Sequence, residues 1–143
     1  MNRSKRITVV DVADRLEQAA HTLKRLPKVA VQGFFGTWPA IVRESMEAYG
    51  WEDAHIHPGP PSPRHITEMD EALRWLMWLE SDDVKLVWLR ACGIRWKAIG
   101  RLTGWSVSKL QHDWRVALVK ITHRLAHPEE KFDFPYKRMI RNG

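Results

Sequence analysis

The sequence predicts an all-α protein of five to seven helices, with a helix-turn-helix in its C-terminal half. Apolar residues recur at steps of three and four in several separate stretches, which is the spacing of one face of an α-helix. Glycine, proline and capping residues stand between these stretches and mark helix ends. The short apolar run Val29–Val31 would be a strand without a partner, so we interpret it as part of a loop.

The predicted helix-turn-helix lies in the last third of the chain. Residues 96–103 have the length of two helical turns, and Gly104 follows where a helix C-terminus favours glycine. Ser106 stands where a second helix would begin, and its hydroxyl can accept a hydrogen bond from an amide of the first turn. Short helix, glycine turn, serine cap and longer helix are the parts of this motif. The apolar stripe of the second helix consists of Leu110, Trp114, Ala117, Leu118, Ile121 and Leu125.

The second helix of this motif also has a polar face. Its N-terminal turns carry side chains that can donate hydrogen bonds to phosphates and base edges. A recognition helix needs this arrangement, because its first turns meet the major groove while its far side packs on the domain. The residues that we expect to contact DNA are Arg95, Lys97, Ser106, Val107, Ser108, Lys109, Gln111, His112 and Arg115.

The positive charge of the chain accompanies this motif. The formal net charge is +6 at pH 7. Residues 1–92 hold 12 Lys/Arg and 13 Asp/Glu, whereas residues 93–143 hold 11 Lys/Arg and 4 Asp/Glu. A positive field attracts polyanions. A basic surface that only meets solvent is the alternative, but the coincidence with the motif favours double-stranded DNA as a partner.

The segment from Ala91 to Leu118 resembles region 4 of bacterial sigma factors and the related response-regulator DNA-binding domains. The shared pattern falls on Gly93, Trp96, Ile99, Gly100, Gly104, Ser106, Val107, Leu110, Ala117 and Leu118. Two positions depart from it. Gly100 stands where alanine is usual, which weakens a helix by roughly 1 kcal/mol. Trp105 stands where an aliphatic residue is usual.

A longer stretch, from about Trp38 to Leu125, resembles an uncharacterised alphaproteobacterial family of prophages and gene transfer agents. That family includes the gene-transfer-agent activator and antiterminator called GafZ. The resemblance implies a transcription regulator that works with host RNA polymerase or its elongation factors, as an antiterminator or activator. The matching residues are Trp38–Glu44, Tyr49-Gly50, Ile66–Leu76 and Leu86–Ala91.

The chain divides into four predicted segments. Residues 1–50 form an N-terminal helical part, with one helix from Val9 to Leu26 and a second that begins near Pro39. Thr8 and Asp11 form a capping box for the first helix. Residues 51–66 contain four prolines and predict a linker. Residues 67–126 form the helix-turn-helix domain, and residues 127–143 form an aromatic-basic tail.

Two helices are predicted to brace the motif from its N-terminal side. Thr67 and Asp70 form a second capping box for the first, and Ser81 caps the next one, which Gly93 ends. Met77 lies on the predicted inward stripe of the first helix. The tryptophans predicted to lie in the core are Trp75, Trp78, Trp88, Trp96 and Trp114.

A partner surface is predicted outside the motif, in the linker and the tail. Aromatic residues beside basic ones are typical interface anchors. A tail that covers the protein's own core is an equal alternative. The residues that we expect to bind a protein partner are Trp51, Phe132, Phe134, Tyr136, Lys137 and Arg138.

Several function classes are disfavoured. No run of eighteen apolar residues or secretory leader is present, so we expect a cytoplasmic protein without a membrane span. The single Cys92 excludes an internal disulfide. His123 and His127 have a zinc-like spacing but no further ligands, so we expect no metal and no cofactor. No phosphate-binding loop or nucleophile motif suggests an enzyme.

Two other classes remain open beside a transcription regulator, which we expect to be a monomer or small homo-oligomer. A phage small terminase subunit also carries a helix-turn-helix, although at its N-terminus, and assembles into rings. A sigma-like module could instead dock on RNA polymerase without reading bases. Gel filtration would detect the rings, and salt-dependent DNA binding would separate the second class.

Overall fold

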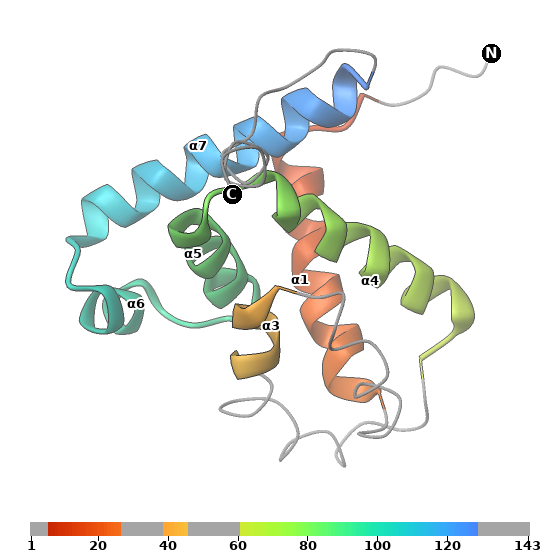
Figure 1. Ribbon diagram of the computed structural model, residues 1–143, viewed down its shortest axis with the longest axis horizontal. Helices are drawn as coiled ribbons and strands as arrows, with labels where there is room; N and C mark the ends of the chain where they lie inside the picture. Colours follow the sequence, from red (N-terminus) through yellow and green to blue (C-terminus); the bar gives the residue numbers. More distant parts are fainter. Residues whose placement is uncertain (1–5, 27–38, 46–60, 129–143) are drawn as a thin grey trace, which may run out of the picture.

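The computed structural model describes residues 6–26, 39–45 and 61–128, and these residues form an all-α fold (Figure 1). Within these ranges there are six α-helices, one 3₁₀ turn and no strand, which confirms the predicted fold class. The elements are α1 (Val9–Arg25), α3 (Ala40–Ser45), α4 (Pro63–Trp75), η4 (Leu76–Trp78), α5 (Ser81–Ala91), α6 (Trp96–Thr103) and α7 (Val107–Ala126).

Helix α1 begins at the predicted capping box. The Thr8 hydroxyl oxygen accepts from the Asp11 amide at 3.2 Å, and the Asp11 carboxylate accepts from the Thr8 amide at 2.9 Å. The helix ends at Arg25, one residue before the predicted Leu26, which has an extended backbone. Leu26 precedes a proline in the sequence, and a residue in that position is disfavoured in helical geometry.

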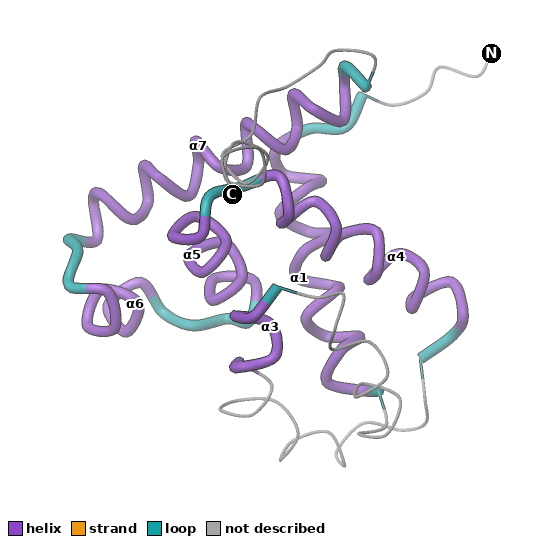
Figure 2. Tube along the Cα trace, viewed as in Figure 1, coloured by secondary structure: helices purple, strands orange, loops and turns teal. Residues whose placement is uncertain are grey.

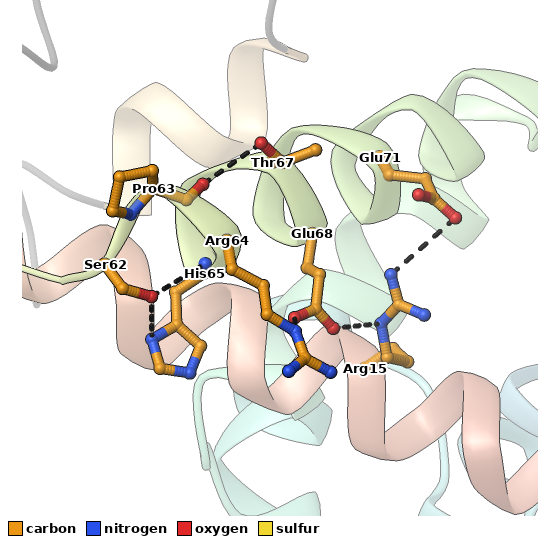
Figure 3. A network of polar contacts seen from close by, with 8 residues as sticks. All are labelled: Arg15, Ser62, Pro63, Arg64, His65, Thr67, Glu68 and Glu71. Carbon is orange, nitrogen blue, oxygen red and sulfur yellow. Dashed lines mark hydrogen bonds and ion pairs between the residues drawn. The ribbon is translucent and has the colours of Figure 1, made fainter.

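The predicted start of α4 was wrong, because the helix begins at Pro63 and not after Thr67. Ser62 is its N-cap, and the Ser62 hydroxyl accepts from the His65 amide at 3.2 Å (Figure 3). Pro63 suits the first helical position, where no amide hydrogen is needed. The Thr67 hydroxyl instead donates to the Pro63 carbonyl at 3.0 Å. Residues 63–66 of the predicted linker are therefore helical.

The predicted cap of α5 was also wrong. Glu80 is the N-cap and makes no side-chain cap bond, while Ser81 is the first helical residue. Asp82 and Asp83 lie in the first turn, where carboxylates suit the positive end of the helix. Burial raises the pKa of Asp83, and Lys120 of α7, whose ammonium lies 3.9 Å from the carboxylate, opposes that shift. As predicted, the helix ends before Gly93, which has a φ of 85°.

The main hydrophobic cluster joins α1, α3, α4, α5 and α7. Its members come from both halves of the chain, so the N-terminal helix and the C-terminal helices share one core. Large fully buried members are Leu16, Leu23, Leu73, Leu76, Trp88, Leu118 and Ile121. Helix α1 also lies along α4, where Arg15 reaches Glu68 and Glu71 at 3.7 Å (Figure 3).

A second hydrophobic cluster fixes the last two helices against α5. Its buried members are Leu86 and Leu89 of α5, Ile99 of α6 and Leu110 of α7. Trp96, Trp105 and Trp114 are partly buried and pack against it. Helix α5 therefore contributes side chains to both clusters, and Figure 1 shows it between α7 and α3.

The tryptophans divide into two groups. Trp75 and Trp88 are buried as predicted, whereas Trp78, Trp96 and Trp114 are only half-buried. Met77 is 42% exposed, so its predicted inward position was wrong. The chain tightens after α4 into the 3₁₀ turn η4, which has three residues per turn, and residue 77 leaves the apolar face of the preceding helix.

The burial of Trp88 generates a stability prediction. Trp88→Ala is expected to lower the free energy of unfolding by about 3–5 kcal/mol, because a large side chain with no exposed area is removed from the main cluster. Met77→Ala is the control and should change stability by within about 0.5 kcal/mol. Urea unfolding followed by circular dichroism measures both. Equal midpoints for the two variants would contradict the assigned core.

Candidate nucleic-acid interface

Helices α6 and α7 are joined by a turn of three residues, 104–106, and form the predicted helix-turn-helix (Figure 2). Gly104 has a left-handed backbone with a φ of 82°, and its amide donates to the Gly100 carbonyl at 2.8 Å. The Ser106 hydroxyl accepts from the Lys109 amide at 3.2 Å and caps α7. The predicted bounds of α6, its glycine end and the serine cap are all confirmed.

The turn lies tightly against α6. A Cβ atom at Gly100 would come within 3.1 Å of the Trp105 carbonyl oxygen. The Thr103 hydroxyl donates to the Ile99 carbonyl at 2.9 Å and accepts from the Trp105 amide at 3.3 Å. A side chain at position 100 would therefore crowd the Trp105 carbonyl oxygen, a contact that glycine avoids.

Trp96 fixes the start of α6 to both neighbouring helices. The Arg90 guanidinium lies 4.6 Å from the centroid of its ring, and the Trp114 ring meets it edge-on with centroids 5.6 Å apart. Arg90 also donates to the Ile94 carbonyl at 3.2 Å. The Arg90 contact joins the start of α6 to α5, and the Trp114 contact joins it to α7, so the orientation of α6 relative to both helices is fixed.

Four cations stand on the outside of this motif. Arg95, Lys97, Arg101 and Arg115 are exposed, and none of them forms an ion pair with another described residue. Arg101 was not among the residues predicted from the sequence. Its signal is its position four residues after Lys97, because that spacing places both on the same side of α6.

The residues of α7 that are predicted to contact DNA differ in how exposed their side chains are and in whether these side chains are already bonded. Ser108, His112 and Arg115 are exposed and follow one another at steps of four and three, so they share a face. Val107 and Gln111 are half-buried, and the Ser106 hydroxyl is used by the cap. Lys109 is exposed but bonded to Asp113. The outer face of α7 continues with Val116 and Val119, which are 39% and 53% exposed.

The predicted partner residues lie outside the described residues. These are Trp51, Phe132, Phe134, Tyr136, Lys137 and Arg138. In the described part of the chain, no group of three His, Cys, Asp or Glu side chains is placed to hold a metal ion. His123 and His127 have ring centroids 4.3 Å apart. Among the helices of the described ranges, none has the length and apolar character needed to cross a membrane.

Residues 24–121 match the family model for a domain of unknown function, DUF6362. The chain belongs to the DUF6362 family. The match includes α3, α4, α5, α6 and most of α7, so α6, the turn and the first turns of α7 lie inside the DUF6362 domain. No curated protein and no solved structure matches the chain.

The left-handed turn of this DUF6362 member can be tested by substitution. Gly104→Ala is expected to destabilise the protein by roughly 1–2 kcal/mol, because a β-carbon is strained in the left-handed conformation. Gly104→Asn should lose clearly less, since asparagine adopts this conformation more readily. Thermal unfolding of both variants measures the difference. Equal losses would show that the backbone conformation of residue 104 is not the cause.

Proposed function

We propose that this DUF6362 protein is a helix-turn-helix DNA-binding protein that regulates transcription. The observation that carries the proposal is a set of exposed cations on the α6–α7 unit that form no ion pair with another described residue, namely Arg95, Lys97, Arg101 and Arg115. Elsewhere, Arg15, Arg64 and Arg74 are all bonded to carboxylates of α4. Four exposed cations gathered on one helix-turn-helix, with no carboxylate partner among the described residues, support a polyanionic partner.

The α6–α7 surface has two groups of exposed polar side chains, and they suit two kinds of contact with DNA. Arg95, Lys97 and Arg101 lie at the start of α6 and on it, and cations at such positions suit phosphates, which fix the orientation of a protein on the duplex. Ser108, His112 and Arg115 lie on the first turns of α7, where hydroxyl, imidazole and guanidinium groups can reach base edges in the major groove. Arg115 is the side chain best suited to guanine.

The proposed biological role follows from the resemblances in the sequence. Likeness to sigma factor region 4 and to the gene-transfer-agent family supports action on phage-like genes together with host RNA polymerase, as an antiterminator or activator. The protein then works in the cytoplasm as a monomer or small homo-oligomer and has no enzymatic activity of its own. The aromatic-basic segment 132–138 is the proposed contact with RNA polymerase or an elongation factor.

DNA binding is tested by removing single cations. Arg101→Ala and Arg115→Ala should each weaken binding to duplex DNA in fluorescence anisotropy. A phosphate contact should reduce the slope of log K against log salt by about 1, whereas a base contact should cost roughly 1–3 kcal/mol at the preferred sequence. Arg74→Ala is the matched control, because it removes an exposed arginine of α4. If both variants lose no more than this control, the interface is wrong.

Polymerase contact is tested separately with the full chain. The tagged protein should retain RNA polymerase from lysate after nuclease treatment, because a direct protein contact does not need DNA. Phe134→Ala should reduce the polymerase retained and leave duplex binding near the wild-type value, since an aromatic anchor carries much of an interface energy. Polymerase that disappears with nuclease would leave a DNA-binding regulator without this contact.

A further inference from the structure

Lys109 differs from Arg95, Lys97, Arg101 and Arg115 because its ammonium already has a carboxylate partner. Its ammonium is bonded to the Asp113 carboxylate one helical turn later and lies 4.7 Å from the centroid of the Trp105 ring. Asp113 is the single acidic residue between Gly93 and Pro128. The one acidic side chain within α6 and α7 therefore pairs with one particular lysine.

The order of charges in this pair is not the one that stabilises a helix most. Lys109 lies in the first turn of α7, where a positive charge opposes the helix dipole. An i,i+4 pair with the cation on the N-terminal side is also the less favourable order. Asp70 and Arg74 of α4 have the favourable order, with the carboxylate first and a distance of 2.9 Å. Arg64 and Glu68 of α4 have the same cation-first order, so what sets the Lys109–Asp113 pair apart is the contact of Lys109 with Trp105 and its place on α7.

Trp105 makes the arrangement of this pair specific. Its ring is half-buried against the second hydrophobic cluster, and its amide is bonded to the Thr103 hydroxyl. A lysine held between a carboxylate and a fixed aromatic face has less freedom to follow a phosphate than the unpaired Arg101 or Arg115. The α6–α7 surface therefore contains two classes of cation. Arg101 and Arg115 are available to a polyanion, whereas Lys109 is held by other side chains of the protein.

We infer that Asp113 is a specificity-determining residue, which limits sequence-independent binding by withholding Lys109 from phosphates. This inference rests on the proposed DNA-binding function. Nonspecific affinity grows with the number of phosphates that cations neutralise, because each neutralised phosphate releases counterions. Asp113 lowers that number and repels the phosphate backbone, but it leaves Ser108, His112 and Arg115 free to read bases. The ratio of specific to nonspecific affinity rises as a result.

The decisive variant is Asp113→Asn, tested on a 30-base-pair duplex of random sequence between 50 and 200 mM KCl. It should bind this duplex several-fold more tightly at 50 mM KCl, and the slope of log K against log salt should steepen by about 0.9, the contribution of one phosphate. Asp70→Asn is the matched control, because it makes the same charge change in another i,i+4 pair on α4. Asp113→Glu should restore the wild-type slope.

A double substitution separates this role from a direct phosphate contact. Lys109→Ala alone should weaken nonspecific binding, because the Asp113 carboxylate is then left uncompensated beside the phosphates. Lys109→Ala combined with Asp113→Ala should return to near the wild-type affinity and slope, since a neutral pair has been removed as a unit. If Lys109 contacts a phosphate, the double variant will instead stay weaker than wild type, and the inference is overturned.

The outcomes also distinguish this inference from the function on which it rests. If Arg101→Ala and Arg115→Ala weaken duplex binding but Asp113→Asn behaves like Asp70→Asn, the protein binds DNA and the role of Asp113 is wrong. If the wild-type protein shows no salt-dependent binding to the duplex, the proposed function fails and the inference fails with it. A steeper slope for Asp113→Asn, but not for Asp70→Asn, supports both the proposed function and the role of Asp113.

Discussion

The packing of α5 is the constraint on which the remaining structure depends. Val87 and Trp88 face the main cluster that α1, α4 and α7 complete, whereas Leu86 and Leu89 face the cluster that holds α6. Neighbouring residues of α5 thus pack into two clusters, and α7 also contributes buried side chains to both. Because both clusters share α5, the orientation of α6 relative to α1 and α4 is fixed by buried side chains, and the basic α6–α7 surface is carried on a rigid support.

Ion pairs are distributed unevenly between the α1–α4 part of the fold and the α6–α7 part. Between α1 and α4, Arg15 lies within ion-pair distance of Glu68 and Glu71. The α6–α7 layer holds one acidic residue against several cations. Exposed ion pairs contribute little to stability, so this contrast does not follow from a need for folding stability. The α6–α7 part of the fold carries a net positive charge.

Local signals made the helix-turn-helix predictable from the sequence. Gly104 and Ser106 act within one turn of their own positions, so the bounds of α6 and the cap of α7 needed no tertiary information. The predictions failed where two local signals competed. Both Ser62 and Thr67 can cap a helix, and the proline after Ser62 decided between them. Likewise Met77 fits a continuous helix, but the chain tightens at η4.

The candidate site was predictable in its location and less so in its chemistry. Spacing alone places Lys109 and Asp113 one turn apart, yet the contact with Trp105 depends on how the turn folds back on α6. Glycine at position 100 leaves room for the turn to fold back on α6, because a β-carbon there would lie 3.1 Å from the Trp105 carbonyl oxygen. The two departures from the sigma-like pattern, at positions 100 and 105, therefore lie in direct contact. A larger residue at 100 would shift the turn, and with it the aromatic face against which Lys109 is held.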